Sequence, residues 1–421
     1  MKNIFNFKVT LSTKSINNIL RLATLAAACL ALPTHALAQS SCPGDLNDDG
    51  QVNSADVGEL LLDYGPCPAP TPSISFVNPS SGQTTGFTAF TIFGTNFTGA
   101  TSVTVGGVAA TSIVVVSSTA ITALSPAHSV GAIDIVVVTP NGTATLVGGF
   151  TYLDSSWYTI LEQAPNPTVV PDAAVRAKIV ASGFPWRVRD NSSGIEMLLI
   201  PGGTFNMGCS ASTRYGCNGD ETNHQVTLSK AFYLGKTEVT QAQWQAKMGI
   251  NPSNFSGNAN NPVEQVSWND IVGFNTATGL RLPSEAEWEY ACRGGTTTAF
   301  HSMPGYPNGT NDDSLRGNIA WYDSNNAGSD RTHAVAGKAA NAFGMYDMSG
   351  NVWEWCNDWW GSTYYSTSPS MDPAGPSSGS YRVLRGGGWG YISDPCRSSY
   401  RDSVGPDPRG YGVGFRVART P

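Results

Sequence analysis

The pattern of apolar and polar positions changes along the chain, and it is clearest in the second quarter. Short runs rich in β-branched and aromatic residues recur there, separated by turn residues such as Pro79, Gly82, Gly106 and Gly107. Short strands at regular spacing with turn signals between them are typical of a β-sandwich. We predict such a sandwich, with strands over residues 74–76, 87–97, 102–105, 113–116 and 133–138.

The C-terminal half has little regular period and is rich in Gly and Trp. Three helix starts can still be recognised, because Thr240, Ser267 and Ser284 each precede a short apolar pattern as an N-cap residue does. A Gln or Glu three residues after the first and last of these caps would complete a capping box. We therefore predict short helices within a fold of mostly short strands and loops.

Residues 1–38 have the pattern of a secretory signal peptide. Four basic and no acidic residues accompany an apolar run over 22–32, and Ala36-Leu37-Ala38 supplies the small residues of a cleavage site. The apolar run is too short to span a bilayer as a helix, and no later segment is suited to do so. We expect a secreted protein, extracellular or periplasmic, without a transmembrane segment.

Acidic side chains outnumber basic ones, with 31 Asp and Glu against 24 Lys and Arg. An acidic surface repels phosphate backbones, so the composition argues against nucleic-acid binding. Charged residues make up 13% of the chain, against about 25% in an average globular domain. Such a surface fits a loop-rich extracellular protein and argues against a helical bundle.

Seven of the eight cysteines lie beyond the signal peptide, and secretion favours disulfides among them. Closeness in sequence suggests the local pairs Cys42 with Cys67 and Cys209 with Cys217. An odd number leaves at least one thiol without a partner in the chain. The pairing of the remaining three stays open at this point: Cys292, Cys356 and Cys396.

A stretch of Asp and Asn residues between Cys42 and Cys67 has the spacing of an EF-hand-type calcium loop. Gly50 occupies the sharp-turn position, and an apolar run follows as an exiting helix would. The candidate ligands at loop positions 1, 3, 5, 7, 9 and 12 are Asp45, Asn47, Asp49, Gln51, Asn53 and Asp56. The stretch resembles one half of a dockerin repeat, which implies calcium and a cohesin-type partner. The alternative is a polar turn without metal.

The predicted sandwich is similar to the IPT/TIG immunoglobulin-like family. The resemblance rests on ISFVNP at 74–79, IFGTNF at 92–97, VTVGG at 103–107 and GFTY at 149–152. It implies a spacer or a binding module.

The C-terminal half resembles the formylglycine-generating enzyme, or sulfatase-modifying factor, family. Eight motifs occur in family order over more than 200 residues, which makes the resemblance specific. They are IPGGTFNMG (200–208), EVT (238–240), PVEQVSW (262–268), RLPSEAEWEYA (281–291), NAFGMYDM (341–348), GNVWEW (350–355), VLRGG (383–387) and GFRV (414–417). The resemblance implies a fold related to C-type lectins, low in regular structure and stabilised by calcium.

The fold class predicted from these patterns is a multidomain chain, mainly β and α+β, in which an immunoglobulin-like sandwich precedes the sulfatase-modifying-factor fold. The predicted divisions are a signal peptide, a dockerin-like loop, the sandwich, a linker and the C-terminal domain, over residues 1–38, 39–69, 70–153, 154–190 and 191–421.

The family resemblance also implies calcium ligands within the C-terminal domain. One site would take side-chain oxygens of Asp347 and Glu354 and backbone carbonyls of Gly350 and Val352. Such a set of hard oxygen donors suits calcium. The alternative is that Glu354 is paired with an arginine. A second family site matches the carbonyls of Asn318 and Ile319, with Asp323 or Asp330 as the acidic partner.

The family's oxidases convert a sulfatase cysteine to formylglycine with dioxygen and copper(I), which two cysteines hold as thiolates. Cys396 matches the second of these cysteines, whereas Tyr391 stands at the first position. A phenol with a pKa near 10 is a poor ligand for soft copper(I). The departure argues against copper and against oxidase activity. For Cys396 the alternatives are a disulfide with Cys292 or Cys356, or a buried inert thiol.

Two functions follow from this reading. The first is a calcium-stabilised, non-oxidase binding protein that presents aromatic and arginine side chains to an extracellular protein, peptide or glycan. The candidate residues are Trp389, Tyr391, Arg397, Tyr400 and Arg401. We expect Trp353, Trp355 and Trp389 to lie mainly in the core. The second is an active formylglycine-generating oxidase with an altered copper site.

Overall fold

The computed structural model describes residues 69–421 apart from 210–215, 326–329 and 392–393. The predicted signal peptide, the dockerin-like loop from Asp45 to Asp56 and the Cys42–Cys67 pair lie outside the described residues. In the part that is described, every helix is too short or too polar to cross a membrane.

Residues Ser73 to Leu153 form two sheets that pack into a sandwich, as predicted. One sheet has the strand order β1-β3-β7-β6 and the other β2-β9-β8-β4-β5. The strands are β1 (Ser73–Asn78), β2 (Ser81–Gln83), β3 (Ala89–Thr95), β4 (Ser102–Val105), β5 (Val108–Ala109), β6 (Thr111–Ser117), β7 (Ala120–Leu124), β8 (Gly131–Thr139) and β9 (Gly142–Leu153).

Alternation of buried and exposed side chains explains why these segments become strands. Ile92 and Ile121 from one sheet meet Val103, Ile135 and Phe150 from the other, and all five are fully buried in a common core. Side chains of a strand point alternately to the two faces, so every second residue reaches this core. The prediction missed β7 and β9, whose apolar positions are interrupted by Thr, Ala and Gly.

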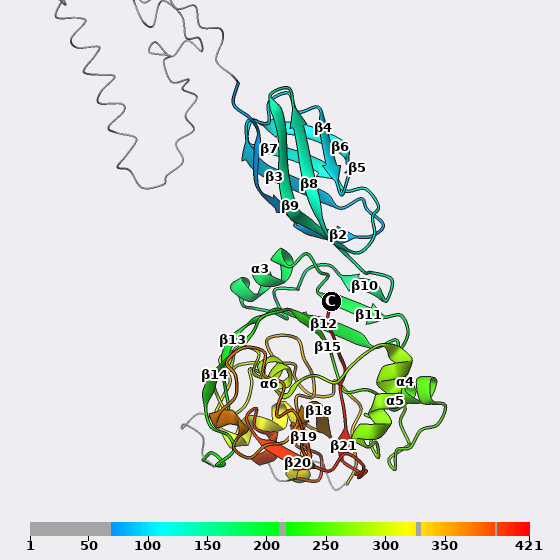
Figure 1. The fold of residues 1–421 in the computed structure, drawn as a ribbon. Coiled ribbons are helices and arrows are strands. Elements are labelled where there is room, and N and C mark those ends of the chain that lie inside the picture. Colours follow the sequence, from blue (N-terminus) through cyan, green and yellow to red (C-terminus); the bar gives the residue numbers. More distant parts are fainter. Residues whose placement is uncertain (1–68, 210–215, 326–329, 392–393) are drawn as a thin grey trace, which may run out of the picture. The chain divides into compact units, whose positions relative to one another are not determined.

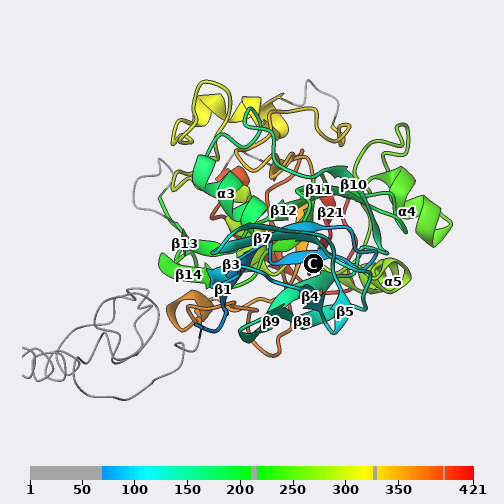
Figure 2. The same cartoon turned by 90° about the horizontal axis from the view of Figure 1, so that it is seen from above.

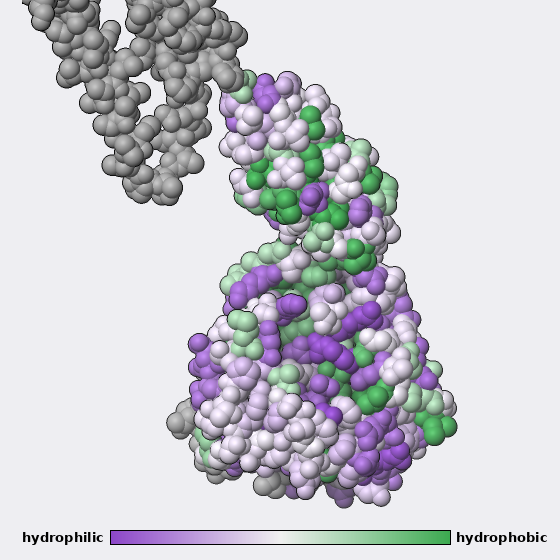
Figure 3. Space-filling view, viewed as in Figure 1, coloured by the Kyte–Doolittle hydropathy of each residue, from purple (hydrophilic) through white to green (hydrophobic). Residues whose placement is uncertain are grey.

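The sandwich keeps apolar side chains on its surface. Val114, Val116 and Val147 are exposed, the last to 81%. Figure 3 shows apolar residues gathered on the visible face of the sandwich, whereas polar residues dominate the visible face of the C-terminal part.

The C-terminal part combines short strands and helices with long loops. Its helices and strands are β10 (Tyr158–Glu162), α3 (Ala173–Ala181), β11 (Arg187–Asp190), β12 (Glu196–Ile200), β13 (Gly203–Met207), β14 (His224–Leu228), β15 (Phe232–Gly235), α4 (Gln241–Met248), α5 (Trp268–Thr278), α6 (Glu285–Arg293), β16 (Ala320–Trp321), β17 (Ser349–Gly350), β18 (Trp353–Trp359), β19 (Arg382–Arg385), β20 (Arg401–Val404), β21 (Val413–Gly414) and β22 (Ala418–Arg419). Four 3₁₀ turns accompany them: η1 (Asp313–Asn318), η2 (Asp323–Asn325), η3 (Tyr364–Ser366) and η4 (Asp394–Cys396).

Residues 154–190, expected as a linker, belong to the C-terminal fold. β10 and β11 extend the antiparallel sheet β10-β11-β12-β15-β22, and Figures 1 and 2 both show them beside β12. Trp157, Ile179 and Trp186 are buried in the same core as Leu198 of β12. The linker prediction was wrong because these apolar residues are widely spaced, so no local period reveals that they pack against distant strands.

The three predicted helix starts are confirmed. Thr240, Ser267 and Ser284 are the N-caps of α4, α5 and α6, and each takes part in a complete capping box. The helix α6 is almost entirely buried. Because it contacts β13, β14, β18 and β19, it fixes the sheet β20-β19-β18-β21, whose loops carry most of the predicted site residues.

Candidate functional site

A glycine turn after β19 positions the segment that matches the family's copper site. Gly386 and Gly387 both have positive φ, at 94° and 75°, a conformation that side-chain-bearing residues rarely adopt. A Cβ on Gly387 would lie 3.0 Å from the carbonyl carbon of Pro395. The absence of a side chain therefore allows the backbone of η4, which carries Cys396, to pack directly on the turn.

Cys396 points into the protein interior. Its side chain is fully buried in a cluster with Phe300, Met303 and Tyr322. Burial raises the pKa of the Cys396 thiol to about 12, although the charge of Arg316 partly opposes the shift. Without a metal this thiol is protonated at neutral pH, and a thiol buried among apolar side chains is a poor nucleophile.

Tyr391, by contrast, faces solvent. Its side chain is 47% exposed, and its ring lies edge-on to Trp353 with centroids 5.5 Å apart. An exposed phenol and a buried neutral thiol do not supply the two accessible thiolates that copper(I) requires. The residues present at these two positions do not fit copper.

The other two thiols offer no replacement. Cys292, Cys356 and Cys396 are all free and buried, so the suggested disulfides between Cys396 and either of the others do not form. Burial raises the pKa of Cys292 to about 11 and that of Cys356 well above its usual value. The pair Cys209–Cys217, in contrast, forms the predicted disulfide.

Two of the arginines predicted for a binding surface are buried instead. Arg397 is 1% exposed and forms a bidentate pair with Glu221, with N–O distances of 2.7 and 2.9 Å. Arg401 is 4% exposed and pairs with Glu285 at 2.6 and 2.8 Å. The prediction for these two was wrong, because their carboxylate partners lie 176 and 116 residues away in sequence.

The aromatic part of the predicted surface is accessible. Tyr391 is exposed and Tyr400 is half-buried, while Trp353 and Trp355 are in the core as expected. Trp389, expected in the core, is half-buried, and its indole N–H donates to the carbonyl of Tyr411 at 3.2 Å. The accessible aromatic surface thus consists of Trp389, Tyr391, Tyr400, Tyr411 and Phe255, whose ring lies 5.3 Å from that of Trp389.

The first predicted calcium site lies in a buried cluster of charges. Glu354 accepts two hydrogen bonds from Arg416, at 2.5 and 2.6 Å, and one from the indole of Trp288 at 2.8 Å. Asp347 accepts from the backbone N–H of Ala336 at 2.6 Å. The arginine pairing of Glu354, considered as an alternative in the sequence, is therefore present.

Glu238 belongs to the same cluster, and the sequence analysis did not identify it. Its carboxylate accepts from the Asn351 amide at 2.7 Å and from the N–H of Val352 at 3.1 Å. Burial, and then the negative charges of Asp347 and Glu354, raise its pKa well above the usual value. Burial likewise raises the pKa of Asp347 to about 6. The EVT motif that contains Glu238 was the available signal.

This cluster has an excess of buried negative charge. Glu238, Asp347 and Glu354 are three carboxylates, and Arg416 is the one cation paired with them in the described residues. A divalent cation would neutralise the remaining two charges, and the carbonyls of Gly350 and Val352 are hard oxygen donors of the kind calcium prefers. The donor types are those that calcium prefers, whereas the described His, Cys, Asp and Glu side chains do not by themselves form a metal-binding group of three.

Among the described residues, the predicted ligands of the second calcium site are not brought together. The carbonyl of Asn318 already accepts a hydrogen bond from the N–H of Ala339 at 3.0 Å, and Ile319 is fully buried. Asp323 begins the short turn η2, and Asp330 has a positive φ of 41°. No contact brings either carboxylate to the two carbonyls in the described part of the chain.

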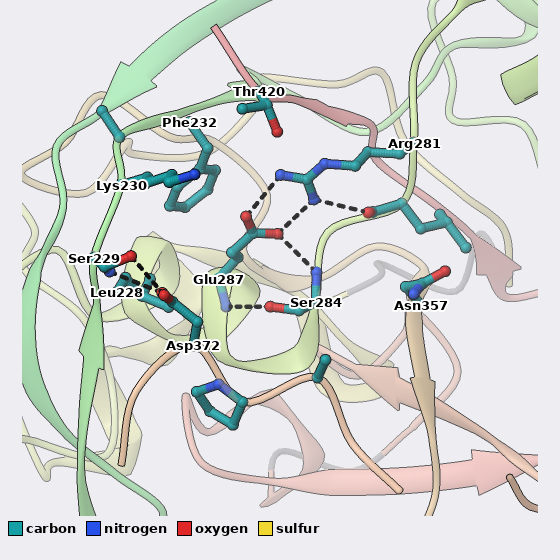
Figure 4. A pocket seen from close by; sticks show the side chains of 14 residues that line it. Leu228, Ser229, Lys230, Phe232, Arg281, Ser284, Glu287, Asn357, Asp372 and Thr420 are labelled. Carbon is teal, nitrogen blue, oxygen red and sulfur yellow. Dashed lines mark hydrogen bonds and ion pairs between the residues drawn. The ribbon is translucent and has the colours of Figure 1, made fainter. Parts of the chain in front are cut away.

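A cavity of about 390 Å³ beside the N-terminus of α6 was not anticipated (Figure 4). Its charged groups satisfy one another: Arg281 forms a bidentate pair with Glu287 at 2.6 and 2.7 Å, and Asp372 accepts from the N–H and hydroxyl of Ser229. Because these groups are already paired, the cavity has few unsatisfied groups for a ligand. The arrangement instead fixes the capping box of α6.

Comparison with known families matches both domains. Residues 186–421 match the sulfatase-modifying factor enzyme 1-like domain, and residues 72–152 match the IPT/TIG domain.

The proteins to which this chain is similar carry different names. A formylglycine-generating enzyme of Streptomyces coelicolor is 31% identical over 276 residues, which cover 52% of this chain and 87% of that protein. The chaperone protein LppX of Paenibacillus barcinonensis is 30% identical over 273 residues, which cover 53% of this chain and 89% of that protein. Among solved structures, Treponema denticola variable protein 1 is 32% identical with a TM-score of 0.48, covering 54% of this chain and 95% of that chain.

Proposed function

This chain belongs to the sulfatase-modifying factor enzyme 1-like family, and from that premise we propose that it is a non-oxidase, ligand-binding member, secreted and stabilised by calcium. The observation that carries the proposal is the position of the two copper-site residues. Tyr391 is exposed to solvent, whereas Cys396 is a protonated thiol in an apolar cluster.

Membership of the family does not decide the activity. One fold hosts many functions, and function depends on the residues of the site. A relative named as a chaperone is about as similar to this chain as one named as a formylglycine-generating enzyme. The name of the chaperone supports a binding function for this scaffold without oxidase chemistry.

The proposed binding surface is the accessible aromatic one, with Trp389, Tyr391 and Tyr411 at its centre. Aromatic side chains give large contact areas at low cost in conformational entropy. The partner would be a protein, peptide or glycan outside the cell. A cohesin-type partner of the dockerin-like loop is a separate prediction, as are calcium in that loop and the signal peptide.

The decisive experiment offers the purified protein a peptide with the family's Cys-x-Pro-x-Arg motif, together with copper(I) and oxygen. Mass spectrometry reports conversion of the peptide cysteine to formylglycine, with the Streptomyces coelicolor relative as the positive control. We expect no conversion by this chain. We also expect none by Tyr391→Cys, because the second thiol would remain buried in an apolar cluster.

Conversion by the natural protein would overturn the proposal and establish the second candidate, an active oxidase with an altered copper site. The 31% identity of this chain to a formylglycine-generating enzyme is the observation in favour of the oxidase. Conversion by Tyr391→Cys alone would mean that Cys396 becomes accessible when a thiolate is restored nearby, and that the natural protein lost its chemistry at one ligand.

A further inference from the structure

A second cavity, of about 540 Å³, lies between the loop that joins α4 to α5 and the loop segment 331–334. The first loop contributes Asn254, Ser256 and Asn258, together with Phe255 between them. The second loop contributes Thr332. Phe255 also belongs to the accessible aromatic surface described above.

The walls of the cavity are held in place before any ligand arrives. The Asn261 amide joins the two loops by donating to the carbonyl and the hydroxyl of Thr332, at 3.1 and 3.2 Å. The N–H of Phe255 donates to Glu264 at 2.8 Å, and the Phe255 carbonyl accepts from Gln241 at 3.1 Å. A preorganised site loses less conformational entropy on binding, so its hydrogen bonds contribute more to affinity.

The rim of the cavity carries polar groups that the chain does not use. Asn254, Ser256 and Asn258 are exposed. Within the described residues, the one hydrogen bond made by these three side chains is that accepted by Asn258 Oδ1 from the N–H of Asn260 at 3.0 Å. Each amide can both donate and accept, and so can the serine hydroxyl. These three side chains therefore offer neutral donors and acceptors to a ligand.

An aromatic surface adjoins this polar rim. The Phe255 ring lines the cavity and lies 5.3 Å from Trp389 and 6.5 Å from Tyr411. Tyr411 is 57% exposed. Aromatic faces of this kind pack against the apolar C–H face of a pyranose ring, while the hydroxyls at the edge of the ring reach polar side chains.

Most of the residues that line the cavity are uncharged. No described residue that lines the cavity is acidic, and each of the two basic ones, Arg331 and His333, has an interaction within the chain. Neutral hydrogen-bonding side chains and an aromatic ring outnumber the basic groups that line the cavity. Such a combination discriminates against ions and against purely apolar molecules, because each would leave part of the site unsatisfied.

We propose that this cavity binds a neutral saccharide, with Asn254, Ser256 and Asn258 bonding its hydroxyls and Phe255 and Tyr411 packing against its rings. The inference rests on the proposed binding function, because it specifies the ligand class for the same aromatic surface. It needs no metal and no covalent step.

The test titrates the whole secreted chain with cellohexaose and mannohexaose by isothermal titration calorimetry, and with oligogalacturonate as an acidic counterpart. The protein is produced in a host that does not glycosylate, because Asn254-Phe255-Ser256 is an acceptor motif. We expect saturable binding of at least one neutral oligosaccharide. Asn254→Ala and Asn258→Ala should each weaken it by about five- to tenfold.

The matched control is Asn260→Ala, which removes an exposed amide from the same loop but outside the cavity lining, and which should leave the affinity unchanged. Tyr411→Ala is a second variant at an exposed position, and it should weaken binding without disturbing the fold. Circular dichroism of each variant verifies that the protein is folded.

Absence of binding to both neutral oligosaccharides would overturn the inference, and so would equal affinity of Asn258→Ala and the natural protein. Preferential binding of oligogalacturonate would also overturn it, since charge would then determine recognition. The formylglycine assay on the same samples separates the two proposals. Conversion of the peptide would remove the proposed function, whereas failed saccharide binding without conversion would remove the ligand class alone.

Discussion

Asp358 on β18 is a carboxyl group buried next to another carboxylate. It is 3% exposed and accepts a hydrogen bond from the N–H of Glu285 at 2.9 Å. Burial, and then the charge of Glu285, raise its pKa from 3.8 to about 8. The folded state therefore binds this proton more tightly than the unfolded state does, so stability falls as pH rises from about 4 to about 8.

Asp358→Asn removes this titration and can keep the hydrogen bond through its amide oxygen. We expect the free energy of unfolding of the natural protein to fall more steeply between pH 5 and pH 8 than that of the variant, by up to about 1.4 kcal/mol per pH unit. Urea unfolding at several pH values measures the two slopes. Asp402→Asn, at an exposed position, should keep the natural slope. Parallel slopes for the natural protein and Asp358→Asn would contradict the assigned pKa.

At the scale of elements, the glutamates of α6 connect several segments of the C-terminal domain. Glu289 accepts from the N–H of Gly208 at 2.9 Å and from Arg293 at 2.8 Å, and it also pairs with Arg385 on β19. On the other side of the helix, Glu287 pairs with Arg281, whose side chain is 39% exposed. The same helix thus carries two buried carboxylates with arginine partners, Glu285 and Glu289, and a third, Glu287, whose arginine partner is partly exposed.

We expect Glu289→Gln to lower the free energy of unfolding by about 3–5 kcal/mol, because it leaves Arg385 buried with less compensation. Glu287→Gln should cost less than about 1 kcal/mol, because its pair is accessible and Gln still completes the capping box. Chemical denaturation of the two variants compares them directly. Similar losses for both would mean that burial does not decide the strength of these pairs.

The sequence predicted elements wherever the signal is local. The caps at Thr240, Ser267 and Ser284 can be recognised from a few neighbouring residues, and all three helices begin there. The strands β10 and β11 could not be predicted in this way, since their partners are defined by tertiary packing. The same holds for Arg397. The sequence predicts a surface residue there, and only the structure shows that Glu221 lies beside it.

The site was predicted in part for the same reason. Family motifs identified Asp347 and Glu354, but the pairing with Arg416 and the presence of Glu238 depend on segments more than 60 residues apart. Likewise, the chemistry of Tyr391 was clear from its residue type, whereas the direction in which Cys396 points required the structure. Residue identity sets what a group can do, and the fold sets whether it is accessible and charged.

At the scale of the whole molecule, the remaining prediction is that bound calcium stabilises the folded protein. The cluster of Glu238, Asp347 and Glu354 has one paired arginine among the described residues, so its surplus negative charge opposes folding unless it is protonated or neutralised by a cation. A cation that binds the folded state raises its stability according to its concentration and affinity.

We therefore expect added calcium to raise the thermal midpoint of the natural protein, and EDTA to lower it, by several degrees at neutral pH. Asp347→Asn should reduce the calcium-dependent part of the shift, because it removes a predicted ligand along with one of the repelling charges. Asp49→Asn tests the dockerin-like loop separately. Differential scanning calorimetry of the two variants measures the two contributions separately, since the substitutions lie in different segments of the chain. A thermal midpoint of the C-terminal domain that changes with neither calcium nor EDTA would contradict this prediction. It would mean that Arg416 and protonation of the buried carboxyls neutralise the cluster without metal.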